Sequence, residues 1–143
     1  MTRAAPALLV AIDTEGDNQW DLAARRHQTF ANVHALDRLH EFFARHHVRP
    51  TYVITYPVAR DAGSVAVLRR LLARGDCEIG AHHHAWETPP CEPDDVARHP
   101  YALSLPLDQF EAQLQALTAA IGDAAGAAPV GAYAAPPAGA SSP

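Results

Sequence analysis

The chain has 143 residues, which is enough for one domain with its own hydrophobic core. Hydrophobic residues make up 48% of it and charged residues 19%, as in globular proteins, and the formal net charge is −5 at pH 7. Because Lys and Arg form no cluster, the sequence argues against nucleic acid or a membrane surface as a partner. No apolar run is long enough to cross a bilayer, and the two cysteines are too few for a disulfide framework, so we expect a cytoplasmic protein.

Predicted strands and helices alternate along the chain. Apolar or β-branched runs predict strands, whereas apolar residues that recur every three or four positions predict helices. Asn32 and Ser64 are predicted to cap the first two helices, and Gly75 to stop the second. In chain order the predicted elements are a fully buried strand at 7–12, a helix at 32–46 with Val33, Leu36, Leu39, Phe42 and Phe43 on its apolar face, a strand at 51–56, a helix at 64–74, a strand at 77–82, a helix at 107–121 and a strand at 129–134.

This alternation predicts βαβ units and therefore an α/β fold built on a parallel sheet. In such sheets, ligand sites form at the carboxyl ends of the strands. The proline-rich segment 85–106 is long for a loop in a compact domain, so we expect it to be functional or disordered. Residues 134–143 are only Ala, Pro, Gly and Ser, which cannot form a packed core. The predicted domain is therefore 7–133, followed by a disordered tail at 134–143.

Two acids follow the first predicted strand. Asp13 and Glu15 lie two residues apart, so both side chains project to the same face of an extended segment. One of them would then ligate a metal while the other stays free to act as a base. The alternative is that they cap a helix or lie in a solvated loop.

Three histidines follow the third predicted strand. His82 and His84 have the same two-residue spacing, which points both imidazoles to one side in a frequent arrangement of metal ligands. His83 would point to the other side. Parallel strands end at the same edge of a sheet, so carboxylate and imidazole would converge there on a divalent metal. The alternative is a polar loop in a chain with nine histidines, the others of which show no ligand spacing and are predicted on helix surfaces or in loops.

A tryptophan lies shortly after each of these polar motifs. Trp20 follows the acids and Trp86 follows the histidines. An indole at the mouth of a site can stack on a sugar ring, which makes both residues candidates for substrate binding. The alternative is that each covers part of the core.

The two motifs resemble those of polysaccharide deacetylases of the NodB-homology group, carbohydrate esterase family 4. Residues 12–17 (IDTEGD) resemble the first motif in the branch that reads Asp-Thr-Glu-Gly-Asp, and residues 78–90 (EIGAHHHAWETPP) resemble the second. The spacer segments 49–52 (RPTY) and 73–76 (ARGD) are also similar to that branch. The similarity spans roughly residues 7–125, and two motifs in order are more specific than either alone.

The resemblance implies the N-terminal part of a distorted parallel (β/α) barrel. It implies a divalent metal, expected to be zinc, held by Glu15, His82 and His84, with Asp13 as the general base. The implied reaction is hydrolysis of a carbon–nitrogen bond that is not a peptide bond, namely N-deacetylation of an acetylated amino sugar. The expected partner is therefore a carbohydrate substrate.

The chain departs from the family pattern in three places. The more widespread second motif spaces its histidines four apart, where Trp86 stands here, so His84 follows the closer branch. The first motif often has adjacent aspartates, so the roles of Asp13 and Glu15 are exchangeable. After residues 129–133 the family has an arginine-bearing third motif and later a general-acid histidine, and this chain has neither. The resemblance therefore suggests a domain truncated at its C-terminal side.

Three hypotheses remain open on the sequence. The chain is a metal-dependent deacetylase, a non-catalytic remnant that binds metal without the third motif and general acid, or a structural α/β domain with incidental histidines. A sugar-binding module lacks the repeated aromatic platform that would support it. Half a barrel would leave an exposed sheet edge, which predicts self-association. The donor set also suits manganese, iron, cobalt and nickel.

Overall fold

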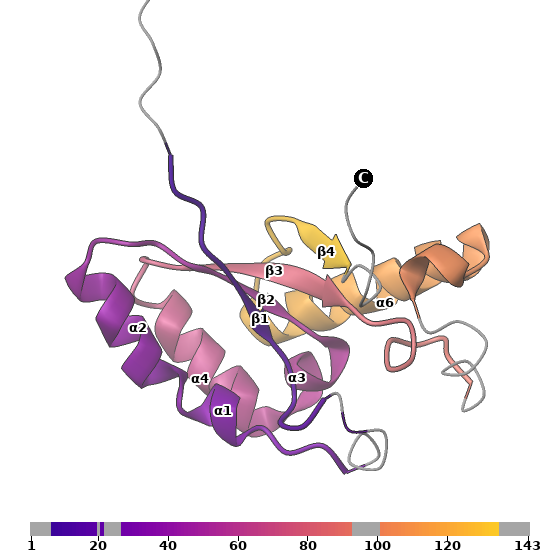
Figure 1. The fold of residues 1–143 in the computed structure, drawn as a ribbon, viewed down its shortest axis with the longest axis horizontal. Coiled ribbons are helices and arrows are strands. Elements are labelled where there is room, and N and C mark those ends of the chain that lie inside the picture. The colour runs from indigo at the N-terminus through magenta and orange to yellow at the C-terminus, as the bar shows by residue number, and fades with distance from the viewer. Residues whose placement is uncertain (1–6, 20, 22–26, 93–100, 135–143) are drawn as a thin grey trace, which may run out of the picture.

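The computed structural model describes residues 7–19, 21, 27–92 and 101–134. They form a mixed α/β fold around one parallel sheet of four strands in the order β1-β2-β3-β4 (Figure 1). The strands are β1 (Ala11–Thr14), β2 (Thr51–Ile54), β3 (Glu78–His83) and β4 (Ala132–Ala134). The predicted parallel α/β sheet is therefore confirmed.

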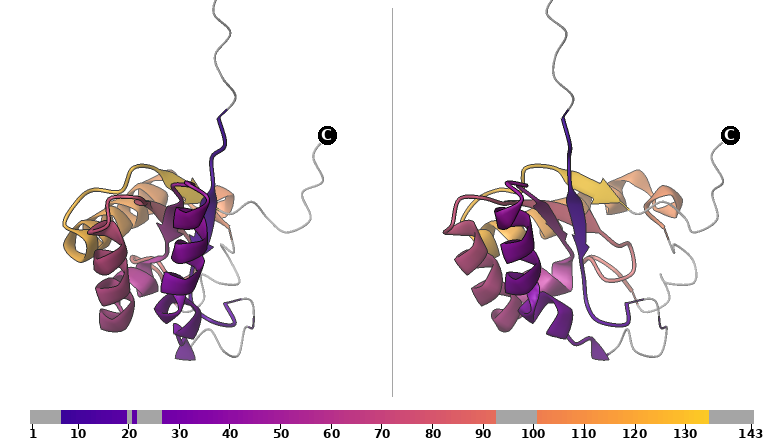
Figure 2. Two further views of the ribbon diagram at one scale, coloured as in Figure 1. Left: turned by 90° about the vertical axis from the view of Figure 1, so that its left-hand side faces the viewer. Right: turned by 60° about the vertical axis from the view of Figure 1, so that its left-hand side comes forward.

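The helices pack on one side of this sheet (Figures 1 and 2). Right-handed crossovers between sequential neighbours place every connecting helix on the same face, which explains the arrangement. The helical segments are α1 (Ala31–His34), α2 (Leu36–Arg45), α3 (Tyr56–Arg60), α4 (Ala62–Leu72), the short 3₁₀ helix η2 (Ala102–Ser104) and α6 (Leu107–Ala125). None of the helices in these described ranges is both long enough and apolar enough to span a membrane.

The two faces of the sheet have different compositions. Tyr52 and Ile54 of β2 and Ile79 of β3 point to the helices and are buried in the core. Side chains alternate along a strand, so their neighbours lie on the opposite face. We call this the helix-free face, and it carries Asp13, Val53, Gly80, His82 and Tyr133, which are matched across the sheet by the strand register.

The first strand begins later than predicted. β1 covers Ala11–Thr14, whereas Leu8 and Leu9 are 78% and 92% exposed, so the expectation of a fully buried strand at 7–12 is wrong. The ladder begins where Thr51 N donates to the Val10 carbonyl at 2.9 Å. Residues 7–9 extend past the start of β2 and pair with no strand in the described part of the chain. The strand consequently includes Asp13, which the apolar pattern had left outside it.

The first predicted helix is divided at Ala35 into α1 and α2. Its cap is not Asn32, because the Asp17 carboxylate accepts from the backbone N–H groups of Ala31 at 2.8 Å and Asn32 at 3.1 Å. Asp17 lies in the loop after β1, so this long-range cap fastens that loop to the helix layer. Asn32 lies inside α1 instead of before it, and its side-chain oxygen accepts from the neighbouring Val33 N at 2.6 Å.

The caps and boundaries of the other elements also differ in detail. Asp61, not Ser64, caps α4, because its carboxylate accepts from Ser64 N at 2.7 Å. The helix ends at Leu72, and Gly75 takes the left-handed conformation with φ 77° in the turn that follows. The predicted tail begins at Ala134, which is the last residue of β4, and residues 135–143 lie outside the described residues.

The predicted apolar face of α2 is wrong at two positions. Leu39 and Phe42 are 37% and 48% exposed, while His40 is completely buried. Both imidazole nitrogens of His40 have partners: Nδ1 lies 2.9 Å from the Tyr52 hydroxyl and Nε2 lies 2.8 Å from Asp76 Oδ1. A histidine that is satisfied at both nitrogens can be buried at little cost. This pairing across α2, β2 and the turn before β3 is not visible in the sequence.

Replacing His40 should destabilise the fold. In His40→Leu the Tyr52 hydroxyl would lose its partner in the core, so we expect the free energy of unfolding to fall by about 1–3 kcal/mol. Urea denaturation measures this change. The double variant His40→Leu/Tyr52→Phe removes both partners and should recover part of the loss. An equal or greater loss in the double variant would contradict this account.

The cap of α4 should make stability depend on pH. Burial opposes ionisation of Asp61, but hydrogen bonds from Ser64 and His34 outweigh it and lower the pKa of this carboxyl group. A carboxyl whose pKa is lowered by folding stabilises the fold above its unfolded pKa, near 4. That contribution is lost as pH falls through the folded pKa.

We therefore expect the free energy of unfolding to fall below about pH 4. The fall should be smaller in Asp61→Asn, which keeps a capping oxygen without the titration. Denaturant titrations at a series of pH values measure this. Identical pH profiles for the wild type and Asp61→Asn would contradict the assignment.

Candidate metal centre

One carboxylate and two imidazoles meet at the carboxyl ends of β1 and β3. Glu15 follows the last residue of β1, His82 lies in β3, and His84 follows it directly. One potential ligand atom from each residue lies within 4.8 Å of the other two. The structure therefore brings together the three residues that the sequence predicted as metal ligands, in a group that could hold a metal ion.

The two distances from Glu15 to the imidazoles fit a small divalent cation. Glu15 Oε2 lies 3.4 Å from His82 Nε2 and 3.3 Å from His84 Nε2. Donors at about 2.0–2.1 Å from a tetrahedral zinc ion stand about 3.3–3.4 Å apart. Two imidazole nitrogens and one carboxylate oxygen are also a donor set that zinc and other first-row metals accept.

Burial supports the same interpretation. The side chains of His82 and His84 are 1% exposed and that of Glu15 is 16% exposed. Glu15 Oε2 is itself buried, and no described residue donates a hydrogen bond to it. A buried carboxylate oxygen without a donor is costly, and a cation would remove that cost. The chemistry and burial of Glu15, His82 and His84 therefore suit a divalent cation.

The backbone around Glu15 is held by the first helix. Asn32 Nδ2 donates to the Glu15 carbonyl at 3.0 Å, and Asp17 N donates to the Thr29 carbonyl at 2.7 Å. Together with the Asp17 cap of α1, these bonds fix the loop after β1 against α1. Asp17, the last acid of the DTEGD segment, thus has a structural role rather than a place among the ligands.

His83 points away from the group, as its place in the strand predicts. Its Nε2 atom lies 2.7 Å from Gln113 Oε1 of α6, on the helix-covered side of the sheet. Burial lowers the pKa of His83. Gln113 Nε2 also donates to the carbonyls of Ala85 at 3.1 Å and Pro90 at 2.9 Å, which holds the loop after β3 against α6.

An aromatic ring stacks on each of the two ligand histidines. Trp86 lies on His84 with a centroid distance of 4.4 Å, and Tyr133 of β4 lies on His82 at 5.4 Å. Trp86, predicted as a substrate-binding residue, is therefore beside the metal group and half-buried. Tyr133 is 44% exposed there, and sequence reasoning missed it. Trp20, the other predicted stacking residue, lies outside the described residues.

Asp13 is not part of the ligand group. It lies in β1, two residues before Glu15 and on the helix-free face, and its side chain is exposed. Strand alternation places it on the same face as Glu15, below the ligands along the strand. Its role as the general base stays a prediction.

Sequence reasoning also missed Glu87. Glu87 Oε1 lies 2.9 Å from His84 Nδ1, and Glu87 Oε2 accepts from Gln19 Nε2 at 2.6 Å and from Gln28 Nε2 at 2.8 Å. Burial opposes its ionisation, but these hydrogen bonds and the nearby His84 outweigh it and lower the pKa of Glu87. An acid three residues after a ligand histidine was a weak signal, whereas both glutamines are far away in the sequence.

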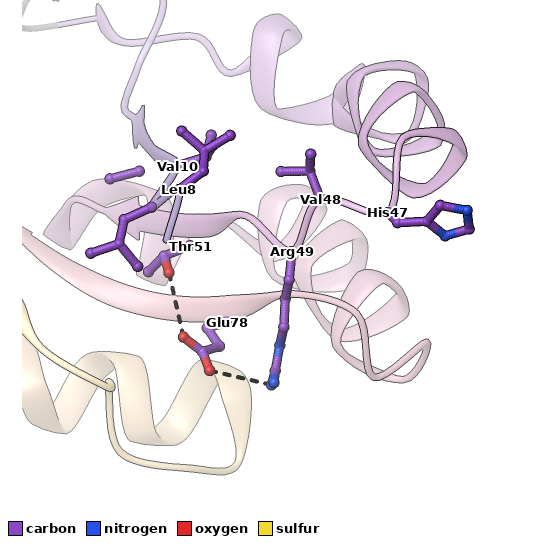
Figure 3. A pocket seen from close by; sticks show the side chains of 9 residues that line it. Leu8, Val10, His47, Val48, Arg49, Thr51 and Glu78 are labelled. Atoms are coloured by element: carbon purple, nitrogen blue, oxygen red, sulfur yellow. Dashed lines mark hydrogen bonds and ion pairs between the residues drawn. The ribbon is translucent and has the colours of Figure 1, made fainter. Parts of the chain in front are cut away.

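A cavity lies at the opposite end of the sheet from Glu15, His82 and His84. It has a volume of about 680 Å³ and is lined by residues at and before the amino ends of the strands, Leu8 and Val10 among them. Figure 3 shows Arg49 and Thr51 turned toward the Glu78 carboxylate, at 3.3 Å and 3.4 Å. Among the described residues it contains no group of three metal ligands. Sites in parallel sheets form at the carboxyl ends, so we place the candidate chemistry at Glu15 and not here.

Comparisons of this chain with protein-family models, with curated proteins and with solved structures found no match. Any functional assignment therefore depends on the sequence motifs and on the geometry described above.

Metal should stabilise the folded chain if this group binds it. At a zinc concentration 100 times the dissociation constant, we expect the free energy of unfolding to rise by about 2.7 kcal/mol relative to metal-free protein. Urea denaturation with zinc or with a chelator measures this difference.

The variant His82→Ala/His84→Ala should lose the stabilisation by zinc. His27→Ala/His46→Ala is the matched control, because it removes two exposed histidines outside the group and should keep the effect. Equal stabilisation of both variants would place the metal elsewhere.

Proposed function

We propose that this protein is a metal-dependent hydrolase of carbon–nitrogen bonds other than peptide bonds, which removes the acetyl group from an acetylated amino sugar. The observation that carries this proposal is the grouping of Glu15, His82 and His84 at the carboxyl ends of β1 and β3. These are the residues that the resemblance to polysaccharide deacetylases assigns as metal ligands. Zinc is the proposed ion, because its usual ligand distances fit their separations.

The strand order supports a partial (β/α) barrel as the fold. In doubly wound sheets the order reverses at a switch point and helices cover both faces. In barrels each strand lies beside the next one in the sequence, with the helices outside. The order β1-β2-β3-β4 with its helices on one side follows the barrel pattern. The helix-free face would correspond to the barrel interior.

The proposed reaction converts an N-acetyl group and water into acetate and a free amine. A bound divalent cation supplies Lewis acidity for the amide carbonyl. The Asp13 carboxylate would take a proton from the attacking water. Trp86 would offer an apolar ring face for the sugar next to His84. On the helix-free face, Asp13 and Tyr133 are exposed and would be open to a carbohydrate substrate.

A second candidate is a protein that binds the metal without hydrolysis. Asp13 lies outside the ligand group and is exposed, so no contact in the described structure poises it as a base. Where contacts are described, the arginines pair elsewhere: Arg49 with Glu78, Arg70 with Asp37 and Arg74 with Glu41. The resemblance expects an arginine to orient the base. Because none of these described contacts joins an arginine to Asp13, they favour the candidate that binds metal without hydrolysis.

Acetate release separates the two candidates. We expect zinc-loaded wild type to release acetate from oligomers of N-acetylglucosamine, and Asp13→Asn to lower the rate by about 10²- to 10⁴-fold with zinc binding unchanged. Enzyme-coupled acetate detection measures the rate. Asp108→Asn, an exposed acid in the first turn of α6, is the matched control and should keep full activity. Stoichiometric zinc without acetate release would favour the non-catalytic candidate.

A further inference from the structure

The Glu87 side chain receives three hydrogen-bonding groups from different parts of the chain. His84 approaches Oε1, while Gln19 and Gln28 donate to Oε2. Its side chain is only 8% exposed, so water cannot readily replace these partners. An ionised carboxylate accepts at both oxygens and donates at neither. Glu87 therefore suits three converging donors, which an amide of the same shape would not.

This arrangement fixes where His84 carries its proton. Glu87 Oε1 only accepts, so the 2.9 Å contact requires a proton on His84 Nδ1. Gln19 Nε2 is also 3.3 Å from Nδ1, but the contact with the carboxylate is shorter and charge-assisted. In a neutral imidazole the lone pair then lies on Nε2, the atom 3.3 Å from Glu15 Oε2.

We propose that Glu87 is a positioning residue of the metal centre, which holds His84 as the tautomer with Nδ1 protonated so that Nε2 is the ligand atom. The inference rests on the metal site of the proposed function. Carboxylates that orient a ligand histidine in this way typically change metal affinity 10- to 100-fold when they are replaced. Glu87 acts through His84 and does not itself join the ligand group.

The partners of Glu87 also connect the two ligand-bearing segments. Gln19 and Gln28 belong to the stretch between β1 and α1 that includes Glu15, whereas Glu87 follows His84. Gly16 makes room for this connection, because a Cβ there would lie 2.9 Å from Gln28 Oε1. The hydrogen bonds of Glu87 thus set the position of His84 relative to the segment that carries Glu15.

His82 provides an internal comparison. Its Nδ1 atom is buried and has no hydrogen-bond partner among the described residues, and its ring is stacked on Tyr133 instead. Nothing equivalent to Glu87 therefore fixes its tautomer. A substitution of Glu87 should therefore change the tautomer of His84 and leave that of His82 unchanged.

The test is the tautomer of His84 in metal-free protein, measured by NMR of ¹⁵N-labelled histidine, together with zinc affinity from chelator competition. We expect wild-type His84 to be protonated at Nδ1. In Glu87→Gln the side-chain oxygen would turn to the glutamine donors and its NH₂ group to His84. His84 should then shift its proton to Nε2, and zinc binding should weaken about 10- to 100-fold.

Two further variants complete the design. Glu41→Gln makes the same chemical change at an exposed side chain of α2, and it should alter neither the His84 tautomer nor the zinc affinity. Gly16→Ala displaces the flexible end of Gln28 while Glu87 remains, so the Nδ1 tautomer should persist and zinc affinity should fall less than in Glu87→Gln.

Wild-type His84 protonated at Nε2, or a folded Glu87→Gln with unchanged tautomer and zinc affinity, would overturn the proposal. If Glu87→Gln does not fold, the tautomer of His84 in the wild type still tests the proposal. A wild type that binds no zinc would refute the proposed function, while the tautomer would still report on Glu87.

Discussion

The candidate metal centre depends on the parallel register of β1, β2 and β3. Asp13 pairs with Val53 and Val53 with Gly80, so the residues that follow, Glu15 and His82, reach the same edge of the sheet. Two strand spacings separate β1 from β3 by roughly 10 Å. Long side chains are needed to meet across that gap, and a shorter acid in place of Glu15 would fall short. A slip of one residue would turn each ligand to the other face.

The electrostatics of the centre follow from burying acids next to imidazoles. Glu87 has its donors within the protein, so its negative charge is compensated there. Glu15 Oε2 is buried beside two imidazole nitrogens and receives no hydrogen bond from a described residue. An uncompensated buried charge is expensive, and a divalent cation held with His82 and His84 would balance the charge of Glu15. The proposed metal would thus supply the positive charge that the described side chains around Glu15 do not provide.

The strand β3 contributes both to the packing against the helices and to the candidate metal centre. In β3, His82 faces the helix-free side, whereas His83 faces α6 and is held by Gln113. The same glutamine binds the Ala85 carbonyl, so the loop that begins after His84 is fixed to the helix layer. The alternation of side chains along a strand makes this division possible, since neighbouring residues meet different environments. Substitutions on the helix side of β3 would therefore shift the positions of His82 and His84.

The sequence by itself determined the parallel α/β arrangement, because strand periodicity is a local signal. The two-residue spacings of Asp13 and Glu15 and of His82 and His84 marked the segments that could carry ligands, and the family resemblance selected Glu15 from the two acids. The sequence did not determine the start of β1, which the length of the neighbouring strand sets, or the burial of His40, which needs partners from distant segments. The positions of Glu87 and Tyr133 beside the ligands were decided only by tertiary structure. Hydrogen bonds and ring contacts between residues far apart in the chain leave no periodic pattern, so only the packed fold reveals them.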